Sequence, residues 1–397
     1  MDFFKVASPD EVRELLKTHF RSIFSREETV SLSESLGRYS ASRIVSKDWV
    51  PNFNKSTVDG YAVKAASTYG ASETIPTMLF NKGEGEMGRI NEETIGAAET
   101  MYIPTGGMIP EGADAVVMIE YSESLGDDIF LSTSVSHGEN LIYKGEDIEP
   151  GDIILEKNIR IKPQNIGALA AGGIANIDVV KNPSFYIIST GDEIKGVEDE
   201  VKPGEIRDIN TYTIGSLIGE CRCELMGSSV VEDDLGLLKD EIKKGMEISD
   251  ILLLSGGSSV GNKDYTCRAI EELGGKILIH GISIKPGKPT IIGDIGGKLV
   301  VGLPGHPVSA MIVFKALLEE IIDLDRALPH RMTLSKSVHS TPGRTTYQPV
   351  GVKGSTAVPI HGKSGVISLL NKAYGYIIIP SEKEGVNSGD EVEVWPL

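Results

Sequence analysis

A glycine- and proline-rich turn at residues 302–310, GLPGHPVSA, is the part of the sequence best suited to bind an anion. It follows the apolar segment 298–301 and precedes an apolar segment at 311–322, so it is predicted to join a strand to a helix. Backbone N–H groups at a helix start have no partner within the helix and can donate to an anion. Pro307 suits the first turn, where the N–H that it lacks would be unpaired. Such turns are common in α/β proteins, so this one alone leaves a purely structural role open.

Three further apolar segments end in loops rich in glycine, hydroxyl groups and charge. The segments are 185–188, 250–254 and 282–284, and their loops are 189–193, 255–264 and 285–289. Ligands of open α/β sheets bind outside the carboxyl ends of the strands, so we expect all four loops to line one crevice. Their content suits a phosphorylated, polyanionic ligand. The residues predicted to bind it are Ser189, Thr190, Gly191, Asp192, Gly256, Gly257, Ser258, Ser259, Lys285, Lys288, Pro304, Gly305, His306, Pro307 and Ser309.

Composition indicates an ordinary soluble globular protein. The 397 residues are 40% hydrophobic and 24% charged, and this length favours roughly two to four domains. The 39 basic and 57 acidic residues give a net charge of −18. That charge argues against nucleic acid as a partner, because generic nucleic-acid binding requires a basic surface. No apolar run is long enough to span a membrane, so no membrane partner is expected.

Cysteine usage favours the cytoplasm. Three cysteines cannot form a disulfide framework. Cys221 and Cys223 alternate in a predicted strand without a second pair at zinc-ligand spacing, so a zinc site is not expected. Residues 1–5 resemble no secretory signal.

The pattern of elements predicts a multidomain α/β protein. Residues 1–48 and 144–178 are predicted to form a helical linking domain, with helices starting at Ser8-Pro9, over 32–36 and over 163–171. Short strands punctuated by glycine predict an inserted β-rich domain at 49–143. Residues 179–328 alternate strands and helices, which predicts a mixed or parallel sheet with flanking helices. Residues 329–397 are predicted to form a C-terminal β-barrel.

A series of short motifs runs along nearly the whole chain. The motifs are PNF at 51–53, STVDGYAV at 56–63, TGG at 105–107, PEGADAVV at 110–117, GEDI at 145–148, STGDE at 189–193, SGG at 255–257 with VG at 260–261 and DY at 264–265, KPGKP at 285–289 and GLPG at 302–305. In this order they resemble the molybdopterin molybdenumtransferase family, whose eukaryotic relative is the C-terminal region of gephyrin. One motif alone could arise by chance, whereas the ordered set is specific.

The resemblance implies a reaction and an assembly. The family inserts molybdate into adenylylated molybdopterin with a divalent cation, here Mg²⁺, and releases AMP and molybdenum cofactor. The resemblance also implies a homodimer whose active site lies between the molybdopterin-binding α/β domain of one subunit and the inserted β domain of the other. The molybdopterin adenylyltransferase is a further possible partner. The residues that the resemblance makes catalytic are Asp59, Thr105, Asp147, Glu193 and Asp264.

Several of these residues also have a plain structural interpretation. Asp192, Glu193 and Asp264 are predicted metal ligands, because Mg²⁺ prefers one or two carboxylates with phosphate oxygens and water. Asp192 and Glu193 could instead cap a helix, and Asp59 could be an ordinary turn residue. Lys285 and Lys288 suit phosphate or molybdate as point charges, but they could also be solvated surface lysines. Asp233-Asp234 is interpreted as a helix start, and the glycines of 255–261 could form a simple turn.

Four positions depart from the family pattern. His306 stands where asparagine is usual, Val58 replaces methionine, Gln348 lies near an expected arginine, and Tyr374 stands in a usual Ala-Asn-Gly context. His306 could add a titratable donor beside the bound phosphate or oxyanion. These departures bear on substrate geometry and on the choice between molybdate and tungstate.

Two other function classes remain open on the sequence. One is an adenylyltransferase-like or nucleotide-hydrolysing enzyme on the same α/β domain. It is disfavoured because standalone adenylyltransferases of this fold lack the inserted β domain and the barrel. The other is a gephyrin-like binding scaffold, which is disfavoured because no long linker or partner-binding extension is visible.

Overall fold

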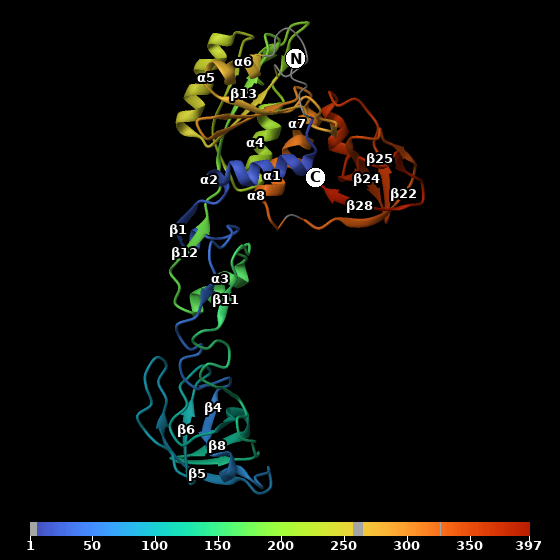
Figure 1. Ribbon diagram of the computed structural model, residues 1–397. Helices are drawn as coiled ribbons and strands as arrows, with labels where there is room; N and C mark the ends of the chain where they lie inside the picture. The colour runs from blue at the N-terminus through green and yellow to red at the C-terminus, as the bar shows by residue number, and fades with distance from the viewer. Residues whose placement is uncertain (1–5, 257–264, 326) are drawn as a thin grey trace. The chain divides into compact units, whose positions relative to one another are not determined.

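The computed structural model describes residues 6–256, 265–325 and 327–397, and the chain divides into two compact units. Unit 1 comprises Met1–Glu28, Gly37–Tyr39 and Asp178–Leu397, and unit 2 comprises Thr29–Leu36 and Ser40–Ile177. Each unit has hydrophobic clusters of its own (Figure 1). The four loops predicted to bind the ligand all belong to unit 1.

A six-stranded sheet forms the centre of unit 1. Its strand order is β16-β13-β17-β21-β20-β18. The first four strands run parallel, while β20 and β18 each run antiparallel to their neighbours. The bounds are Ser184–Thr190 (β13), Glu224–Val231 (β16), Ile251–Ser255 (β17), Lys276–His280 (β18), Ile291–Ile295 (β20) and Lys298–Leu303 (β21).

Helices cover both faces of this sheet, because its central strands are apolar on both sides. Along β13, Phe185 and Ile187 join one cluster, and Tyr186 and Ile188 join the other. The first cluster includes residues of α1 (Pro9–His19), α4 (Asn210–Glu220) and α7 (Pro307–Phe314), and the second includes residues of α5 (Leu235–Ile248) and α6 (Tyr265–Glu272). Figure 1 shows α5 and α6 on one side of the sheet and α4 and α7 on the other. The predicted α/β architecture is confirmed.

Local signals explain several helix boundaries. Ser8 caps the start of α1, as predicted, and the structure adds that Ser8 and Glu11 form a reciprocal capping box. Asp234 caps α5 by accepting a hydrogen bond from the Leu237 N–H. The predicted helical segment 311–322 is confirmed as helical backbone, continuing from α7 through a π-helical turn, Lys315–Glu319, into α8 (Glu320–Ile322). In that turn the buried Lys315 ammonium donates to the Glu319 carboxylate at 2.6 Å.

The C-terminal part of unit 1 is a closed β-barrel, as predicted. Its strands pair in the ring β24-β25-β22-β28-β26, and β26 pairs again with β24. The bounds are His330–Leu334 (β22), Thr345–Lys353 (β24), Thr356–Pro359 (β25), Gly375–Ile379 (β26) and Glu391–Pro396 (β28), with a side ladder of β23 (Val338–His339) and β27 (Gly385–Val386).

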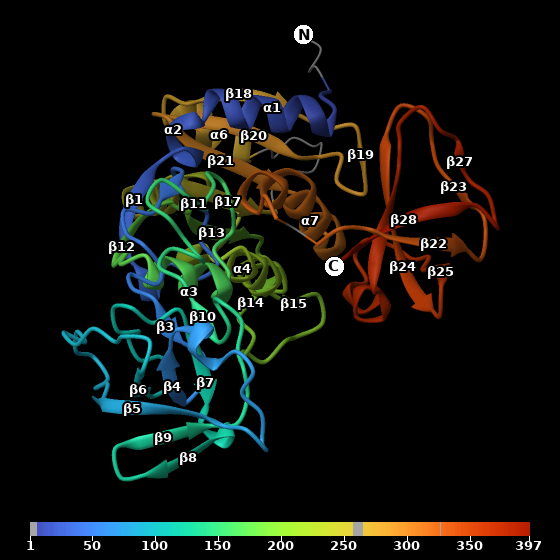
Figure 2. The ribbon, with the colours of Figure 1, turned by 90° about the horizontal axis from the view of Figure 1, so that it is seen from below.

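The third predicted strand of the α/β domain has a different partner from the one expected. Residues 282–284 do not join the central sheet. Instead, β19 (Ile284–Lys285) pairs in parallel with β24 of the barrel, in the register Ile284↔Thr345 and Lys285↔Thr346. Figure 2 shows β19 reaching out of the α/β domain toward the barrel. The loop 285–289 therefore lies where the barrel adjoins the α/β domain.

Unit 2 contains a second six-stranded sheet, of order β7-β4-β6-β5-β9-β8. It corresponds to the predicted inserted β-rich region, with bounds of Gly60–Val63 (β4), Thr77–Glu84 (β5), Glu99–Ile103 (β6), Ala115–Met118 (β7), Ser122–Leu125 (β8) and Asp128–Leu131 (β9). The helix predicted over 163–171 is confirmed as α3 (Pro163–Ala171). Shorter elements along the chain are α2 (Arg21–Phe24), β1 (Glu27–Ser31), β2 (Ile44–Val45), β3 (Lys55–Ser56), β10 (Leu141–Ile142), β11 (Ile153–Leu155), β12 (Asn176–Val180), β14 (Ile194–Lys195) and β15 (Ile206–Arg207).

Two local predictions are wrong. Cys221 and Cys223 lie in the turn between α4 and β16, where Arg222 has a left-handed φ of 56°. The alternation of these thiols with a charged residue resembles a strand in sequence, and in the structure burial raises the pKa of the Cys221 thiol to about 12. The helix predicted over 32–36 is only a 3₁₀ turn, Leu32–Glu34, because a polar, serine-rich segment offers little apolar surface to bury.

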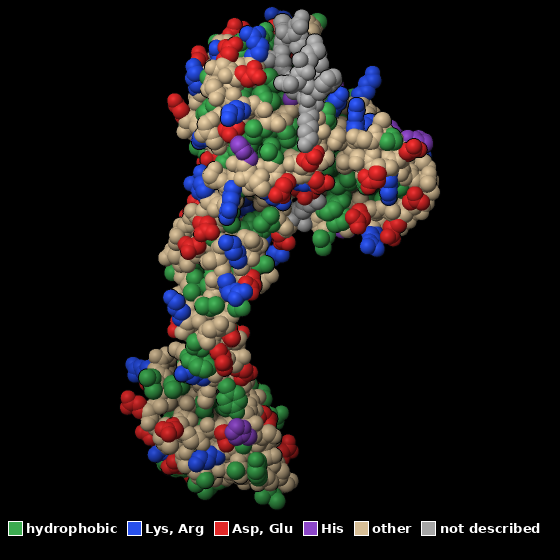
Figure 3. All heavy atoms as spheres, viewed as in Figure 1, with side chains coloured by type: hydrophobic (Ala, Val, Ile, Leu, Met, Phe, Trp, Pro, Cys, Tyr) green, Lys and Arg blue, Asp and Glu red, His purple; other side chains and the backbone are tan. Residues whose placement is uncertain are grey.

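No helix in the described ranges has both the length and the apolar character needed to cross a membrane. On the face shown in Figure 3, acidic and basic side chains are interspersed over the described residues.

Candidate active site

The register of the central sheet brings four strand ends together. Ser189 of β13 lies opposite Ser255 of β17, which lies opposite Leu303 of β21. On the other side of β13, Thr190 lies opposite Val231 of β16. The loops that follow these parallel strands therefore leave the sheet at the same edge.

A cavity of about 620 Å³ lies at this edge. All four predicted loops contribute to it, so their convergence is confirmed within the described residues. A volume of this size suits a small-molecule ligand. The lining residues are Thr190, Gly191, Glu193, Asp233, Gly256, Ile284, Lys285, Pro286, Gly287, Lys288, Pro289, Pro304, Gly305, His306, Ser309, Arg344 and Ser364.

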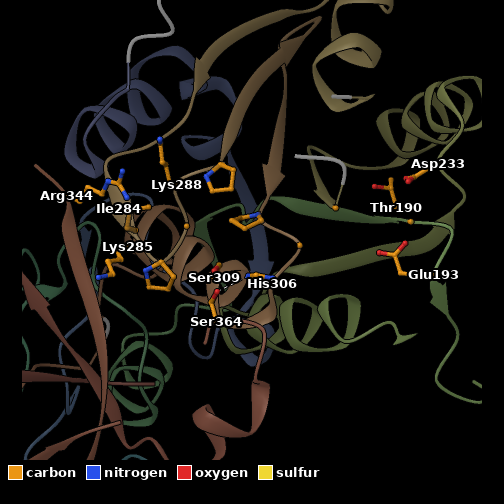
Figure 4. Close-up of a pocket in the computed structure, with 17 residues that line it drawn as sticks. Thr190, Glu193, Asp233, Ile284, Lys285, Lys288, His306, Ser309, Arg344 and Ser364 are labelled. Carbon is orange, nitrogen blue, oxygen red and sulfur yellow. Dashed lines mark hydrogen bonds between the residues drawn. The ribbon is translucent and has the colours of Figure 1, made fainter. Parts of the chain in front are cut away.

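One end of the cavity is acidic. Figure 4 shows Thr190, the last residue of β13, together with Glu193 and Asp233, which lie on the loops after β13 and β16. Asp192 does not line the cavity, but its Oδ1 accepts a hydrogen bond from the Asp233 N–H at 2.9 Å. This bond ties the two loops together, so Asp192 helps to position Asp233.

A close backbone contact shapes the acidic end. Gly256 has a φ of +101°, and a Cβ on it would lie only 2.3 Å from the carbonyl oxygen of Thr190. Glycine is therefore required at this position for both steric and conformational reasons. The buried Oγ1 of Thr190 has no hydrogen-bond partner among the described residues.

The opposite end of the cavity is basic. Figure 4 shows Lys285, Lys288 and Arg344 on that side, away from Glu193 and Asp233. Arg344 comes from the barrel and immediately precedes β24, whose pairing with β19 brings it beside Ile284, at the same end of the cavity as Lys285. The two lysines and the arginine make this end suitable for a polyanion.

Hydroxyl groups and an imidazole lie between the two ends (Figure 4). Ser309 is in the first turn of α7, and His306 is the residue before that helix. The Nδ1 of His306 lies 2.9 Å from the Oγ of Ser364, which belongs to a barrel loop. The N–H of Val308 donates to the carbonyl of Ser364 at 3.2 Å. The barrel loop is thus held against the start of α7 by two hydrogen bonds.

Buried polar side chains fix the strand ends behind the cavity. The Nδ2 of Asn210 donates to Ser255 Oγ at 2.6 Å and to the Gly305 carbonyl at 2.9 Å, so it joins the ends of β17 and β21. Ser189 does not line the cavity but donates to the buried Asp208 carboxylate at 3.2 Å. Because buried polar groups are costly when unpaired, these bonds favour one arrangement of the loops.

The predicted ligand-binding residues fall into three groups. Thr190, Gly191, Glu193, Gly256, Lys285, Lys288, Pro304, Gly305, His306 and Ser309 line the cavity, and Ser189, Asp192 and Pro307 lie behind or beside it. Gly257, Ser258, Ser259 and Asp264 lie outside the described residues. The functional roles of all of them stay predictions.

Three chemically important lining residues were missed by sequence reasoning. Asp233 follows β16, whose sequence ELMGSSVV is too polar to predict a buried strand, although its position after a strand was a usable signal. Arg344 and Ser364 lie in the barrel, far from the four loops in sequence. No local pattern marks them, because only the pairing of β19 with β24 brings them to the cavity.

The remaining predicted catalytic residues belong to unit 2. Asp59 and Thr105 lie together, because the Thr105 N–H donates to Asp59 Oδ1 at 2.7 Å. Burial raises the pKa of the neighbouring Tyr102, and the Asp59 charge adds to this rise. Asp147 is exposed and its N–H donates to the Val50 carbonyl. Asp59 and Thr105 are exposed as well, and so are accessible to a ligand.

The acidic end has the donor set that Mg²⁺ prefers. No cluster of three or more His, Cys, Asp or Glu side chains suited to a metal occurs among residues 6–256, 265–325 and 327–397. Mg²⁺, however, commonly takes one or two carboxylates and completes its shell with phosphate oxygens and water. Glu193 and Asp233 supply two carboxylates, and the unpartnered Thr190 hydroxyl supplies a neutral oxygen. These residues fit a phosphate-bridging cation.

Comparisons with known proteins agree with this architecture. Three family models match the chain in succession: "MoeA N-terminal region (domain I and II)" at residues 7–173, "Probable molybdopterin binding domain" at 186–323 and "MoeA C-terminal region (domain IV)" at 331–397. The molybdopterin molybdenumtransferase of Bacillus subtilis strain 168 is 30% identical over 391 residues, which cover 92% of this chain and 89% of the relative. That of Staphylococcus aureus strain COL is 30% identical over 377 residues, covering 92% and 90%. The chain belongs to the molybdopterin molybdenumtransferase family.

Solved structures of this family share the fold. A molybdopterin biosynthesis MoeA protein from Pyrococcus horikosii is 36% identical, with a TM-score of 0.84 and coverage of 99% of each chain. The MoeA protein of Pyrococcus horikoshii OT3 is 29% identical, with a TM-score of 0.80 and coverage of 99% and 100%. The protein is therefore a multidomain member of the molybdopterin molybdenumtransferase family, as the sequence motifs predicted.

Proposed function

We propose that this enzyme inserts molybdate into adenylylated molybdopterin and releases AMP and the finished molybdenum cofactor. The observation that carries the proposal is the division of one cavity into a basic end and an acidic end at the carboxyl edge of a parallel sheet. The reaction combines anionic substrates with cleavage of a phosphoric anhydride. Its polyanionic ligands require both cationic side chains and a charge-neutralising metal.

In this proposal the basic end holds the tetrahedral oxyanion. Lys285, Lys288 and Arg344 supply positive charge, and the hydroxyls of Ser309 and Ser364 supply neutral donors beside them. Molybdate and tungstate are tetrahedral dianions of nearly equal size, so this set of donors would accept either. Because the net charge of the chain is −18, these local cations are needed to offset the repulsion of anions.

The acidic end holds the divalent cation together with the phosphate groups. Glu193 and Asp233, with Asp264 as a further predicted ligand, would bind Mg²⁺. The metal, when bound, neutralises phosphate charge as the anhydride is cleaved. The chain's own contribution here is to fix the position of the phosphates. Asp192 holds the Asp233 loop in place, and the lack of a side chain at Gly256 lets its backbone approach Thr190 closely.

The homodimer is part of the same proposal. Asp59, Thr105 and Asp147 belong to unit 2, while the cavity belongs entirely to unit 1. A partner subunit would supply these three residues, as the resemblance implies. Complementation tests this arrangement: Glu193→Gln and Asp59→Asn should each be inactive, whereas mixed dimers should regain up to about a quarter of the activity. A mixture that stays inactive despite exchange of subunits would exclude a shared site.

The central test is a direct assay of the reaction. Purified protein should release AMP from adenylylated molybdopterin when molybdate and Mg²⁺ are both present, and should not do so when either is omitted. Turnover at matched concentrations of molybdate and tungstate then determines the working oxyanion. No AMP release from verified substrate would overturn the proposal.

The cellular setting follows from the same proposal. None of the three cysteines, Cys221, Cys223 and Cys267, forms a disulfide within the described residues, which supports a reducing compartment such as the cytoplasm. The substrate must come from an enzyme that adenylylates molybdopterin, so a molybdopterin adenylyltransferase is the proposed protein partner. Co-purification of the two proteins in the presence of adenylylated molybdopterin tests this association.

A further inference from the structure

The contact between His306 and Ser364 joins two parts of unit 1 inside the cavity. His306 precedes α7 but makes no side-chain cap to that helix. Its Nδ1 instead lies 2.9 Å from Ser364 Oγ, and both residues line the cavity. The backbone of Ser364 is held separately, by the Val308 N–H that donates to its carbonyl at 3.2 Å. The loop is therefore held by a backbone bond as well as by the imidazole, and the contact of the imidazole with the hydroxyl has a further consequence.

That consequence concerns the single hydrogen of the serine hydroxyl. If His306 Nδ1 accepts this hydrogen, Ser364 has none left to donate to an anion. If Nδ1 carries a hydrogen, it donates to Ser364 Oγ, and the hydroxyl hydrogen is free to point into the cavity. An oxyanion without hydrogens can only accept hydrogen bonds, so it requires the second arrangement. Protonated imidazole always carries a hydrogen on Nδ1 and enforces this arrangement.

The charges facing this pair favour an anion beside it. Lys285 and Arg344 face the cavity from β19 and from the residue before β24, and Lys288 faces it from the loop after β19. Glu193 and Asp233 face it from the loops after β13 and β16, and Figure 4 shows them on the far side from the lysines. Lys363 is exposed next to Ser364. A dianion at the basic end would favour protonation of the imidazole, and the protonated imidazole would favour the dianion.

We propose that His306 is a positioning residue that turns the Ser364 hydroxyl into a hydrogen-bond donor for the tetrahedral oxyanion. The inference rests on the proposed function, because it presupposes that the basic end binds this anion. It adds that oxyanion binding tightens as the imidazole becomes protonated, and that this effect passes through Ser364. Asparagine, the residue that the family pattern places here, can donate a hydrogen bond without titrating, so the pH effect would be specific to a chain with histidine.

Calorimetric titration of the full-length protein with molybdate and with sulfate, at pH 6.2 and pH 8.4, tests this inference. Sulfate keeps its charge over this range, so its profile reports the protein alone. For the unmodified protein we expect affinity at pH 6.2 to be roughly three- to tenfold higher than at pH 8.4, the order expected of one added charge in a partly solvated site. His306→Asn should bind with the same affinity at both pH values. His330 is an exposed barrel histidine whose ring lies at a tilt beside Tyr374 outside the cavity, so His330→Asn should keep the normal profile.

The variant Ser364→Ala distinguishes an effect of His306 through the Ser364 hydroxyl from a direct effect of the imidazole charge on the anion. This variant keeps the backbone bond to Val308, so the loop should stay folded. If His306 acts through the hydroxyl, Ser364→Ala should weaken binding and remove most of the pH dependence, and adding His306→Asn should change little more. A full pH profile in Ser364→Ala would overturn the inference, because His306 would then act directly. Absence of molybdate binding by the unmodified protein at both pH values would overturn the oxyanion site itself, and this inference with it.

Discussion

The two ends of the cavity are built in different ways. The acidic end comes from loops that directly follow neighbouring parallel strands, β13 and β16, so one sheet positions Glu193 and Asp233. The basic end combines β19 and the loop after it with Arg344 of the barrel, and Ser364 of the barrel lies beside it. The position of the acidic residues is thus determined by one sheet, whereas the basic end forms only because the barrel packs against the α/β domain.

This difference in construction predicts that the two ends of the cavity have different functions. A site on one rigid sheet is suited to holding a metal and phosphates in fixed geometry, since small displacements there are costly to catalysis. A site made by two domains is suited to admitting a small oxyanion, because the barrel contributes donors without altering the sheet. Changes at the acidic end should therefore affect turnover, and changes at the basic end should affect affinity for molybdate.

The largest expected effect is at the acidic end. Glu193→Gln keeps the shape of the side chain but removes its charge, so AMP release at saturating molybdate should fall about 100-fold. Affinity for molybdate should stay within about twofold, because the basic end is intact. Glu232→Gln is the matched control, since Glu232 is exposed and does not line the cavity. Equal losses in both variants would contradict the assignment.

The next effect is at the basic end. Arg344→Gln and Lys288→Gln should each weaken molybdate binding about tenfold, because each loses one charge-assisted contact, and turnover at saturating molybdate should change much less. Calorimetry and AMP release measure the two quantities separately. Lys353→Gln, at the other end of β24, should change neither. If Arg344→Gln mainly reduced the maximum rate, the two ends would not divide binding from chemistry as proposed.

Substituting two glycines with alanine tests how tightly the backbone is packed at the acidic end. Gly256→Ala forces a left-handed backbone on alanine and also drives its Cβ against the Thr190 carbonyl. Gly204→Ala meets the same backbone penalty at a φ of +96° but has no atom within 4 Å. The first change should lower the free energy of unfolding of unit 1 by about 2 kcal/mol more than the second. Urea unfolding of both variants gives the comparison, and equal losses would mean that the close approach carries no constraint.

The smallest effect is at the opposite edge of the same sheet. Asp250 directly precedes β17, and burial alone would raise its pKa. Hydrogen bonds from the Arg26 guanidinium and from Ser184 outweigh burial and lower the pKa below its ordinary value of 3.8. Arg26→Gln should therefore cost about 1 kcal/mol of stability near neutral pH, a modest value because Arg26 is partly exposed. Molybdate affinity and turnover should not change.

The pH dependence of this variant has a definite sign. A lowered folded-state pKa stabilises the protein above the unfolded-state value, and this stabilisation is lost as pH falls through the folded-state pKa. The difference in stability between the unmodified protein and Arg26→Gln should therefore be constant near neutrality and shrink below about pH 4. A difference that grew at low pH would show that the ion pair has another role.

The sequence alone was sufficient for features that depend on local pattern. Apolar strands followed by polar loops predicted three of the four parallel strands, β13, β17 and β21, and Ser8-Pro9 predicted the start of α1. The ordered motifs predicted the family, which the matching relatives confirm. Such features are predictable because each depends on residues close together in the chain, with known periodicity and capping preferences.

Only the tertiary structure decided which distant residues meet. It paired the end of segment 282–284 with the barrel and brought Arg344 and Ser364 to the cavity. It also placed Asp233, which follows β16, at the cavity as a second carboxylate beside Glu193. It also showed that Cys221 and Cys223 lie in a turn. These outcomes depend on strand pairing and domain packing between segments that are far apart in the chain. No single segment determines them, because the interactions that favour them involve many distant residues at once.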